Sequence, residues 1–221
     1  DAGEVVTVAI TPDVVTFGGG IHHSLAVALE SGVVVVDPPQ HEDRSLAVIK
    51  AVTARWPDKP ISHSILSHHH YDHSGGIRAY AAIGAELVIA EGDRDFVTQC
   101  LARPHTISPD TLAGTAARPT IRTVGDNGLS LGGGAIEVHR ISSPHCAENL
   151  VVYVAGPKLL FNADLFNPGL VPAGVVPPPY WLTYSRDFRR QIEALELDIE
   201  LLLGAHGALE GGPGVPVAGV E

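Results

Sequence analysis

The feature that most constrains how this chain can fold is the stretch of residues 68–73, which reads HHHYDH and follows the pattern H-x-H-x-D-H. Imidazole nitrogen and carboxylate oxygen are the preferred ligands of zinc and similar first-row metals. Because side chains at positions i and i+2 of an extended segment point to the same side, His68 and His70 can bind one ion. The chain must then turn, which makes Asp72 and His73 available to a second ion close to the first.

A histidine-rich loop or a tag-like run is the alternative interpretation of this stretch. A tag would lie at a terminus and repeat one residue, whereas this stretch is internal and continues into Ser74, Gly75 and Gly76. The pattern therefore favours a metal site.

The first half of the sequence alternates between strand-like and helix-like segments. Runs rich in β-branched residues and bounded by Gly, Pro or Asp predict strands at residues 4–10, 14–17, 24–30, 33–36, 61–66 and 86–90. Apolar residues at helical spacing predict helices at residues 41–55, 75–83 and 93–101. This alternation predicts an α/β layered fold, with the histidine-rich stretch at the carboxyl end of a strand.

The second half is richer in strands, which are predicted at residues 119–124, 129–131, 135–141, 149–154 and 158–162. Two long irregular segments, 102–118 and the Pro-rich 167–184, are typical of lids or binding loops. The clearest amphipathic helix is predicted at residues 186–203. We expect one domain over residues 1–221, with residues 210–221 as a flexible tail.

The composition disfavours several classes of function. A net charge of -11, from 14 basic and 25 acidic residues, disfavours nucleic-acid binding because an acidic surface repels phosphate. No apolar run approaches the roughly 18 residues that a membrane span needs, and two cysteines cannot form a disulfide framework. Methionine is absent even at position 1, so the N-terminus is expected to be processed or truncated. The compartment and the oligomeric state stay open.

Three further candidate ligands lie at the ends of predicted elements. His145 lies in a polar turn between two strands, and His206 follows the last predicted helix. Asp164 comes one step past an apolar strand, where a carboxylate is costly unless it is paired or bound to a cation. Such ends are where α/β folds place ligands and chemistry.

Together these residues resemble the metallo-β-lactamase-fold hydrolase superfamily, which includes class B β-lactamases, glyoxalase II and acyl-homoserine lactone lactonases. The resemblance covers nearly the whole chain, from a strand ending at Asp37 through the H-x-H-x-D-H pattern to His145, Asp164 and His206 in the family's order. It implies a four-layer αβ/βα sandwich of two mixed β-sheets with outer helices and the metals at one edge.

The resemblance also implies a set of seven ligands for two Zn²⁺ ions, with iron or manganese as alternatives. The first ion would be bound by His68, His70 and His145, the second by Asp72, His73 and His206, and Asp164 would bridge the two. A hydroxide between the ions would attack the carbonyl of a small-molecule lactone, thioester or β-lactam. Asp72 is the expected catalytic residue, which orients this nucleophile or passes a proton to the leaving group.

Four further residues are candidates for supporting the ligands or contacting the substrate. Asp37 is expected to hydrogen-bond a ligand histidine, although a turn residue before Pro38 and Pro39 is an equally good interpretation. His22 precedes a strand near a hairpin and is a candidate substrate contact. Tyr180 and Trp181 are candidates for lining the site, but aromatic residues of a Pro-rich loop equally often anchor the loop itself.

Substrate and reaction class stay open at this point. An aspartate at position 164 resembles glyoxalase II and the lactonases more than the β-lactamases that have cysteine there, which favours lactone or thioester substrates. An iron-dependent oxidoreductase on the same scaffold, similar to persulfide dioxygenases, would use most of the same ligands. A non-catalytic metal-binding module is the third alternative, although every expected ligand is present.

Overall fold

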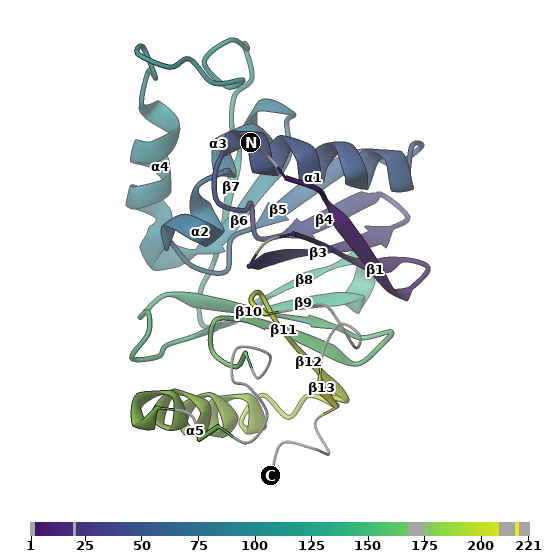
Figure 1. Ribbon diagram of the computed structural model, residues 1–221, viewed down its shortest axis with the longest axis vertical. Coiled ribbons are helices and arrows are strands. Elements are labelled where there is room, and N and C mark those ends of the chain that lie inside the picture. The colour runs from purple at the N-terminus through teal and green to yellow at the C-terminus, as the bar shows by residue number, and fades with distance from the viewer. Residues whose placement is uncertain (1–2, 20, 168–174, 177, 208–214, 217–221) are drawn as a thin grey trace.

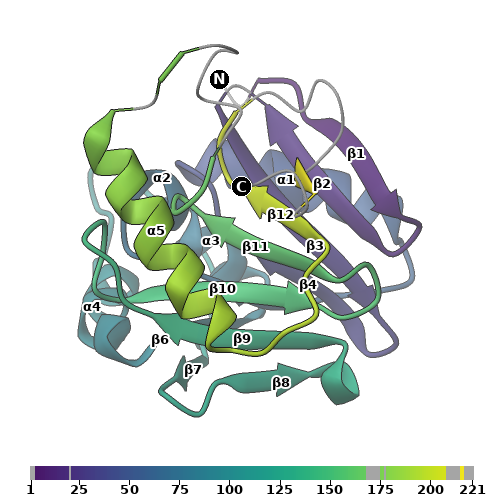
Figure 2. The same cartoon turned by 90° about the horizontal axis from the view of Figure 1, so that it is seen from below.

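Two β-sheets face each other in the computed structural model, which describes residues 3–19, 21–167, 175–176, 178–207 and 215–216. Three helices, α1 (Glu42–Arg55), α3 (Ile77–Ala82) and α4 (Arg94–Ala102), cover the outer face of one sheet, and α5 (Pro179–Glu193) covers the other (Figures 1 and 2). These four layers confirm the αβ/βα sandwich that the sequence predicts.

The first sheet contains seven strands in the order β1-β2-β3-β4-β5-β6-β7. Their bounds are β1 Val6–Thr11, β2 Val14–Gly19, β3 His22–Leu29, β4 Gly32–Val36, β5 Ile61–Ile65, β6 Glu86–Ala90 and β7 Ile121–Val124. The strands from β1 to β4 pair antiparallel, and those from β4 to β7 pair parallel. The parallel strands need crossover connections, and α1, α3 and α4 provide them.

The second sheet contains six strands in the order β13-β12-β11-β10-β9-β8. Their bounds are β8 Leu129–Leu131, β9 Ile136–Ile141, β10 Asn149–Val154, β11 Leu159–Ala163, β12 Leu201–Gly204 and β13 Val215–Pro216. Only β11 and β12 pair parallel, and α5 lies between them in the chain. The short helix α2 (Tyr71–Ser74) and the 3-10 helices Glu91–Asp93 and Gly132–Gly134 complete the regular elements among the described residues.

Successive side chains along a strand point to opposite faces of its sheet. The apolar side chains on the two inner faces pack together and form the hydrophobic core between the sheets. Val34 and Ile65 of the first sheet belong to one buried cluster with Val152 and Phe161 of the second. A separate cluster lies between the first sheet and its helices, and a third between the second sheet and α5, where Phe188 is buried. Burial of this apolar surface, at roughly 25 cal/mol per Å², holds the four layers together.

The prediction of a helix over residues 186–203 is wrong at both ends. The helix begins earlier, at Pro179, because proline suits the first helical turn, where its missing N–H has no intrahelical acceptor. It ends at Glu193, and Glu196 has a positive φ of 53°, which no α-helix accommodates. The apolar spacing continues beyond the helix because Ile192, in α5, and Leu202, in strand β12, both face the same cluster.

The predicted tail, residues 210–221, lies outside the described residues except for Val215–Pro216, which pair antiparallel with β12. In the part of the chain that the structure describes, no helix is long and apolar enough to cross a membrane.

Arg78 anchors the irregular segment 102–118 to the helices beneath it. From α3, its guanidinium donates hydrogen bonds to both carboxylate oxygens of Asp110 and to the carbonyl oxygens of Cys100 and Leu101, at 2.9 Å and 2.8 Å. Replacing Arg78 with methionine should lower the free energy of unfolding by about 3 kcal/mol, since these acceptors lose their partner. Urea titration measures this loss. The exposed pair in α5 provides the control, because Arg190→Met should cost less than about 1 kcal/mol.

The same pair makes stability depend on pH in the acid range. Hydrogen bonds from Arg78 lower the pKa of Asp110 to about 2. Because this value lies below that of an unfolded aspartate, the stabilisation is fully present above about pH 4 and is lost as the pH falls through about 2. The stability difference between wild type and Asp110→Asn should therefore shrink over this interval, and a constant difference would contradict the assignment.

Candidate metal centre

The seven expected ligand residues lie at one edge of the sandwich, where strands of both sheets end. The H-x-H-x-D-H stretch follows β5 and runs into the short helix α2 (Tyr71–Ser74). On the second sheet, His145 lies in the β9–β10 loop, Asp164 directly follows β11, and His206 follows β12. Segments that are distant in sequence thus bring their polar side chains to a shared place.

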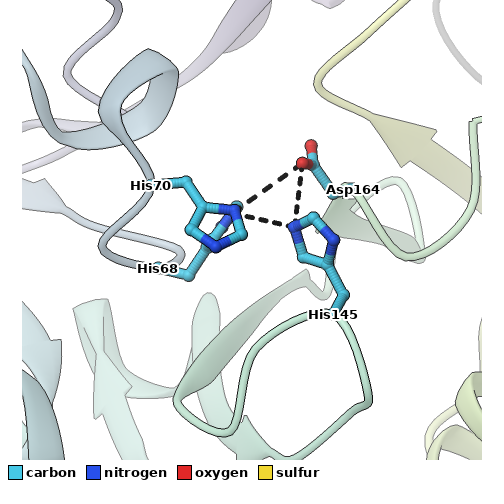
Figure 3. Close-up of side chains that lie close together, drawn as sticks. All are labelled: His68, His70, His145 and Asp164. Carbon is cyan, nitrogen blue, oxygen red and sulfur yellow. Dashed lines mark hydrogen bonds and ion pairs between the residues drawn. The ribbon is translucent and has the colours of Figure 1, made fainter.

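The first group of side chains consists of His68, His70, His145 and Asp164 (Figure 3). The Nε2 atoms of His68 and His145 lie 3.2 Å apart, and they lie 3.7 Å and 3.1 Å from Oδ2 of Asp164. The ring of His70 lies 4.5 Å from that of His68 and 4.6 Å from that of His145, centroid to centroid. One donor atom from each of the four residues lies within 4.8 Å of the others.

The second group consists of Asp72, His73, His206 and again Asp164. Oδ1 of Asp164 lies 3.0 Å from Nε2 of both His73 and His206. Oδ2 of Asp72 lies 3.2 Å from Nε2 of His206 and 3.5 Å from Nε2 of His73. Asp164 therefore directs one carboxylate oxygen to each group, which is the arrangement that a carboxylate needs to bridge two cations.

Two buried atoms test whether these residues fit a cation. Nε2 of His73 and Oδ1 of Asp164 are both buried, and neither has a hydrogen-bond partner among the described residues, although they lie 3.0 Å apart. Buried polar atoms without partners are rare because each costs about 1–3 kcal/mol. Coordination of an ion satisfies the lone pairs of both, and the mixed imidazole and carboxylate set suits zinc and related metals.

The opposite ring nitrogens of three histidines are held by other groups, which directs their Nε2 atoms to the two groups. Nδ1 of His68 lies 3.1 Å from Oγ of Ser67, and Nδ1 of His73 lies 2.8 Å from Oδ2 of Asp37. Nδ1 of His206 lies 2.7 Å from the carbonyl oxygen of Ile21. Such partners are typical of metal-binding histidines, because they fix ring orientation and tautomer.

Asp37, the partner of Nδ1 of His73, directly follows β4. Its backbone φ is 63°, a left-handed conformation that aspartate tolerates better than most residues. The carboxylate is fully buried, and its Oδ1 accepts a 2.9 Å hydrogen bond from the backbone N–H of Ser67. The carboxylate thus lies where the sequence interpretation expects it, against a histidine of the motif.

Burial and charge act in opposite directions on the protonation of the buried groups. Burial lowers the pKa of His73, but the carboxylates of Asp37 and Asp164 outweigh it and raise this pKa to about 10. Burial raises the pKa of Asp164, but the close imidazoles of His145, His206 and His73 hold it well below its usual range. In the absence of an ion, protons therefore occupy the cluster, and binding of an ion releases them.

Strand β3 fixes the position of His206 from the opposite sheet. His22 and His206 form an isolated antiparallel bridge, and the N–H of His23 donates a 2.8 Å hydrogen bond to the carbonyl of Ala205. This cross-sheet bridge, made by His22, His23, Ala205 and His206, ties the start of β3 to the end of β12. His206 therefore has little freedom relative to the first sheet.

The loop that carries His145 folds around the hydroxyl of Ser143. Its Oγ accepts hydrogen bonds from the backbone N–H groups of His145 and Cys146, at 3.1 Å and 3.3 Å, and from the side-chain amide of Asn149. Serine hydroxyls commonly stabilise turns in this way. The loop thus presents His145 to His68.

The structure modifies the expectations for the remaining candidates. His22 is only 1% exposed and its Nε2 lies 3.3 Å from Nδ1 of His73, so it packs behind that candidate ligand and is not accessible to a substrate. Burial lowers its pKa to about 3, which leaves it neutral. Tyr180 and Trp181 lie in α5, not in an irregular loop. His69, the remaining histidine of the motif, joins neither group and lies 3.2 Å from Asp93.

Several supporting residues were missed by the sequence interpretation. Ser67 and Ser143 carry no distinctive pattern, and only their places next to His68 and His145 mark them. The carbonyl of Ile21 is a backbone group, so no residue type could identify it.

Solved structures of known proteins share this fold. A metallo-beta-lactamase from Pontibacter korlensis superposes with a TM-score of 0.66 at 18% identity, covering 93% of this chain and 92% of its own. A metallo beta lactamase from Hirschia baltica gives the same TM-score and identity, with 92% and 91% covered. At this identity the similarity shows the fold alone.

Sequence comparisons give the family. The 2,4-dinitroanisole O-demethylase subunit alpha of Nocardioides sp. (strain JS1661) is 26% identical over 196 residues, which is 86% of this chain. The chain spans about half of that relative, 54% of its length. The family model described as the metallo-beta-lactamase superfamily matches residues 17–206, which includes all seven residues of the two groups. The chain belongs to the metallo-beta-lactamase superfamily.

Proposed function

We propose that this protein is a hydrolase that binds two metal ions, zinc in the first instance, and opens a lactone, thioester or β-lactam carbonyl. The observation that carries the proposal is the position of Asp164, whose two oxygens lie 3.0 Å and 3.1 Å from histidines of different groups. A single-metal site needs no such shared carboxylate. A purely structural metal site is closed by four ligands, whereas here Asp72 remains 36% exposed.

The protein's own residues prepare this site. Two bound ions would supply Lewis-acid chemistry, polarising the substrate carbonyl and lowering the pKa of the attacking water. Asp37 holds Nδ1 of His73, and Ser67 holds Nδ1 of His68, so that their Nε2 atoms stay directed to the two groups. This preorganisation avoids reorientation of the ligands during the reaction.

Asp72 is positioned to handle a proton. Its Oδ2 faces His73 and His206, whereas Oδ1 has no hydrogen-bond partner among the described residues. Oδ1 can accept a hydrogen bond from the attacking water and pass its proton to the leaving group.

Replacing Asp72 with alanine should lower kcat by about a thousandfold at saturating metal, within the range for loss of a general acid or base. The fold should stay intact, because the side chain is partly exposed. Steady-state kinetics and circular dichroism measure the two effects. Asp95→Ala removes an exposed carboxylate from α4 and should change neither, and full activity of Asp72→Ala would contradict the assigned role.

Metal analysis and a substrate panel test the proposal as a whole. Protein purified without chelators should contain about two zinc ions per chain, whereas one iron per chain would favour an oxidoreductase. Nitrocefin, an acyl-homoserine lactone and a simple thioester represent the three substrate classes, and turnover of the lactone or thioester is expected to dominate. If the metal-replete protein hydrolysed none of the three, the proposal would fail.

Hydrolysis of an activated aryl methyl ether is a second candidate, favoured by the relative whose name gives 2,4-dinitroanisole O-demethylase. Water would replace methoxide on the ring or attack the methyl carbon, and either route yields the phenol and methanol. Incubating metal-loaded protein with 2,4-dinitroanisole and recording the absorbance of 2,4-dinitrophenol tests this candidate. An unchanged absorbance over many hours would remove it.

A further inference from the structure

Three aromatic side chains at the start of α5 form a chain of ring contacts that begins at a candidate metal ligand. The ring of Tyr184 lies 6.3 Å from that of His145, at an interplanar angle of 71°. Tyr180 lies 5.9 Å from Tyr184 and 6.2 Å from Trp181, again edge to face. Rings at these distances and angles attract each other, so the first turns of α5 present ordered aromatic surface next to His145.

Two more aromatic side chains of the other half of the sandwich lie close to the candidate ligands, one next to them in sequence and one through an intervening histidine. Tyr71 lies between His70 and Asp72 in the chain and is 68% exposed. Phe96 of α4 is 41% exposed, and its ring lies 5.7 Å from that of His69, which is itself 5.2 Å from His70. We call these five side chains the aromatic patch: Tyr71, Phe96, Tyr180, Trp181 and Tyr184.

The aromatic patch does not serve the core. The chain has five Phe, five Tyr and two Trp residues, so the patch holds a large share of its rings. None of its members belongs to the three hydrophobic clusters, which instead use rings such as Phe17, Tyr80 and Phe161. Single exposed aromatic residues need no explanation, but their gathering beside the candidate ligands does.

The patch has contributions from both halves of the sandwich. Phe188 packs α5 onto the second sheet, and Val97 packs α4 onto the first. Figures 1 and 2 show the two helices on opposite outer layers. The patch therefore offers aromatic surface from both halves close to the candidate ligands: Tyr184 contacts His145 on one half, and Phe96 contacts His69, the neighbour of His70, on the other.

We infer that the aromatic patch binds a planar aromatic ring of the substrate, so that the preferred substrates carry an aryl group beside the bond that is hydrolysed. This inference rests on the proposed function for the identity of that bond. The occupant is a small molecule because the patch is continuous with the candidate ligands. Ring edges and faces offered by five aromatic side chains complement an aryl group far better than a flexible alkyl chain.

The first test measures binding without turnover, with a matched pair of probes. Benzamide and cyclohexanecarboxamide share the amide and differ only in the ring. Ligand-observed NMR titration of the metal-loaded protein should show benzamide binding about two- to thirteenfold more tightly, since an aromatic pair contributes about 0.5–1.5 kcal/mol beyond area burial. Equal affinities would overturn the inference.

Single substitutions assign the preference to the patch. Tyr184→Leu and Phe96→Leu should each reduce the preference for benzamide towards unity, whereas Tyr184→Phe should retain it because the ring remains. Leu182→Ala is the matched control, because Leu182 is an exposed apolar residue of α5 without a ring and should leave the preference unchanged. A preference that survives both leucine variants would contradict the assignment.

A kinetic test separates failure of the inference from failure of the proposed function. Phenylacetyl- and hexanoyl-homoserine lactone present the same hydrolysable ring, and kcat/KM should be higher for the phenylacetyl substrate. In Tyr184→Leu this difference should disappear, mainly because KM for the phenylacetyl substrate rises. Equal kcat/KM values would overturn the aromatic preference and leave the hydrolase proposal standing. Conversely, a protein that holds two metal ions, prefers benzamide and hydrolyses no member of the panel would support the aromatic patch and refute the hydrolase.

Discussion

Replacing Asp164 with asparagine should remove metal from both groups at once and lower turnover by at least about a thousandfold. Each of its oxygens lies within 3.1 Å of a histidine Nε2, one in each group, and a neutral amide cannot provide two anionic oxygens. Metal content after gel filtration and steady-state kinetics measure the loss. No other single residue belongs to both groups among the described part of the chain.

The control for this variant is Asp198, a carboxylate in the connection between α5 and β12, away from the candidate ligands. Asp198 is exposed and pairs with Lys158 at 2.8 Å, so Asp198→Asn should retain both metal ions and full turnover. If Asp164→Asn also retained two ions per chain, the carboxylate would not bridge them, and the proposed two-metal hydrolase would lose its main support.

Replacing Asp37 with asparagine should weaken metal binding to the second group by about 10- to 100-fold, the usual cost of losing a partner of a ligand histidine. The buried carboxylate holds Nδ1 of His73 at 2.8 Å, and a neutral amide would no longer stabilise a positively polarised ring. Chelator competition should show one site with weakened metal affinity and one site with the affinity of the wild type. The free energy of unfolding of the metal-free protein should also fall by about 2 kcal/mol, because a charge-assisted hydrogen bond is lost.

A second carboxylate–histidine pair in the same sheet serves as the control for Asp37. Glu86 lies 3.3 Å from Nε2 of His63 and also pairs with Arg122, away from the ligands. Glu86→Gln should leave both metal affinities unchanged. Equal weakening in the two variants would indicate a general loss of stability instead of a specific effect on His73.

The elements that the sequence predicted well are those whose conformation is determined by their own residues and the turns beside them. Apolar and polar residues alternate over residues 129–131, and residues 149–154 are mostly apolar. Turn signals flank both stretches, and both form strands with the predicted bounds. The grouping of His68 with His70 could also be predicted locally, because it follows from their spacing in the sequence alone. The approach of His145, Asp164 and His206 was expected only from family resemblance, because their contacts are made between distant strands.

What the sequence did not predict depends on tertiary packing. The segment from Leu195 to Leu202 keeps helical spacing but adopts turn and strand, since the outer face of the second sheet buries these apolar residues in either conformation. His22 was expected near the substrate, and only the pairing of β3 with the end of β12 reveals that it is buried. Nothing in the local sequence around His22 encodes that partner.

The sharing of candidate ligands between the two sheets would link release of metal to opening of the sandwich. In each group, two residues follow β5 of the first sheet, and Asp164 together with His145 or His206 comes from the second. An ion bound by either group therefore joins the two layers at the edge where the cross-sheet bridge already connects them. Separating the sheets there would require the ion to leave, so loss of metal and local unfolding of this edge would be one cooperative event.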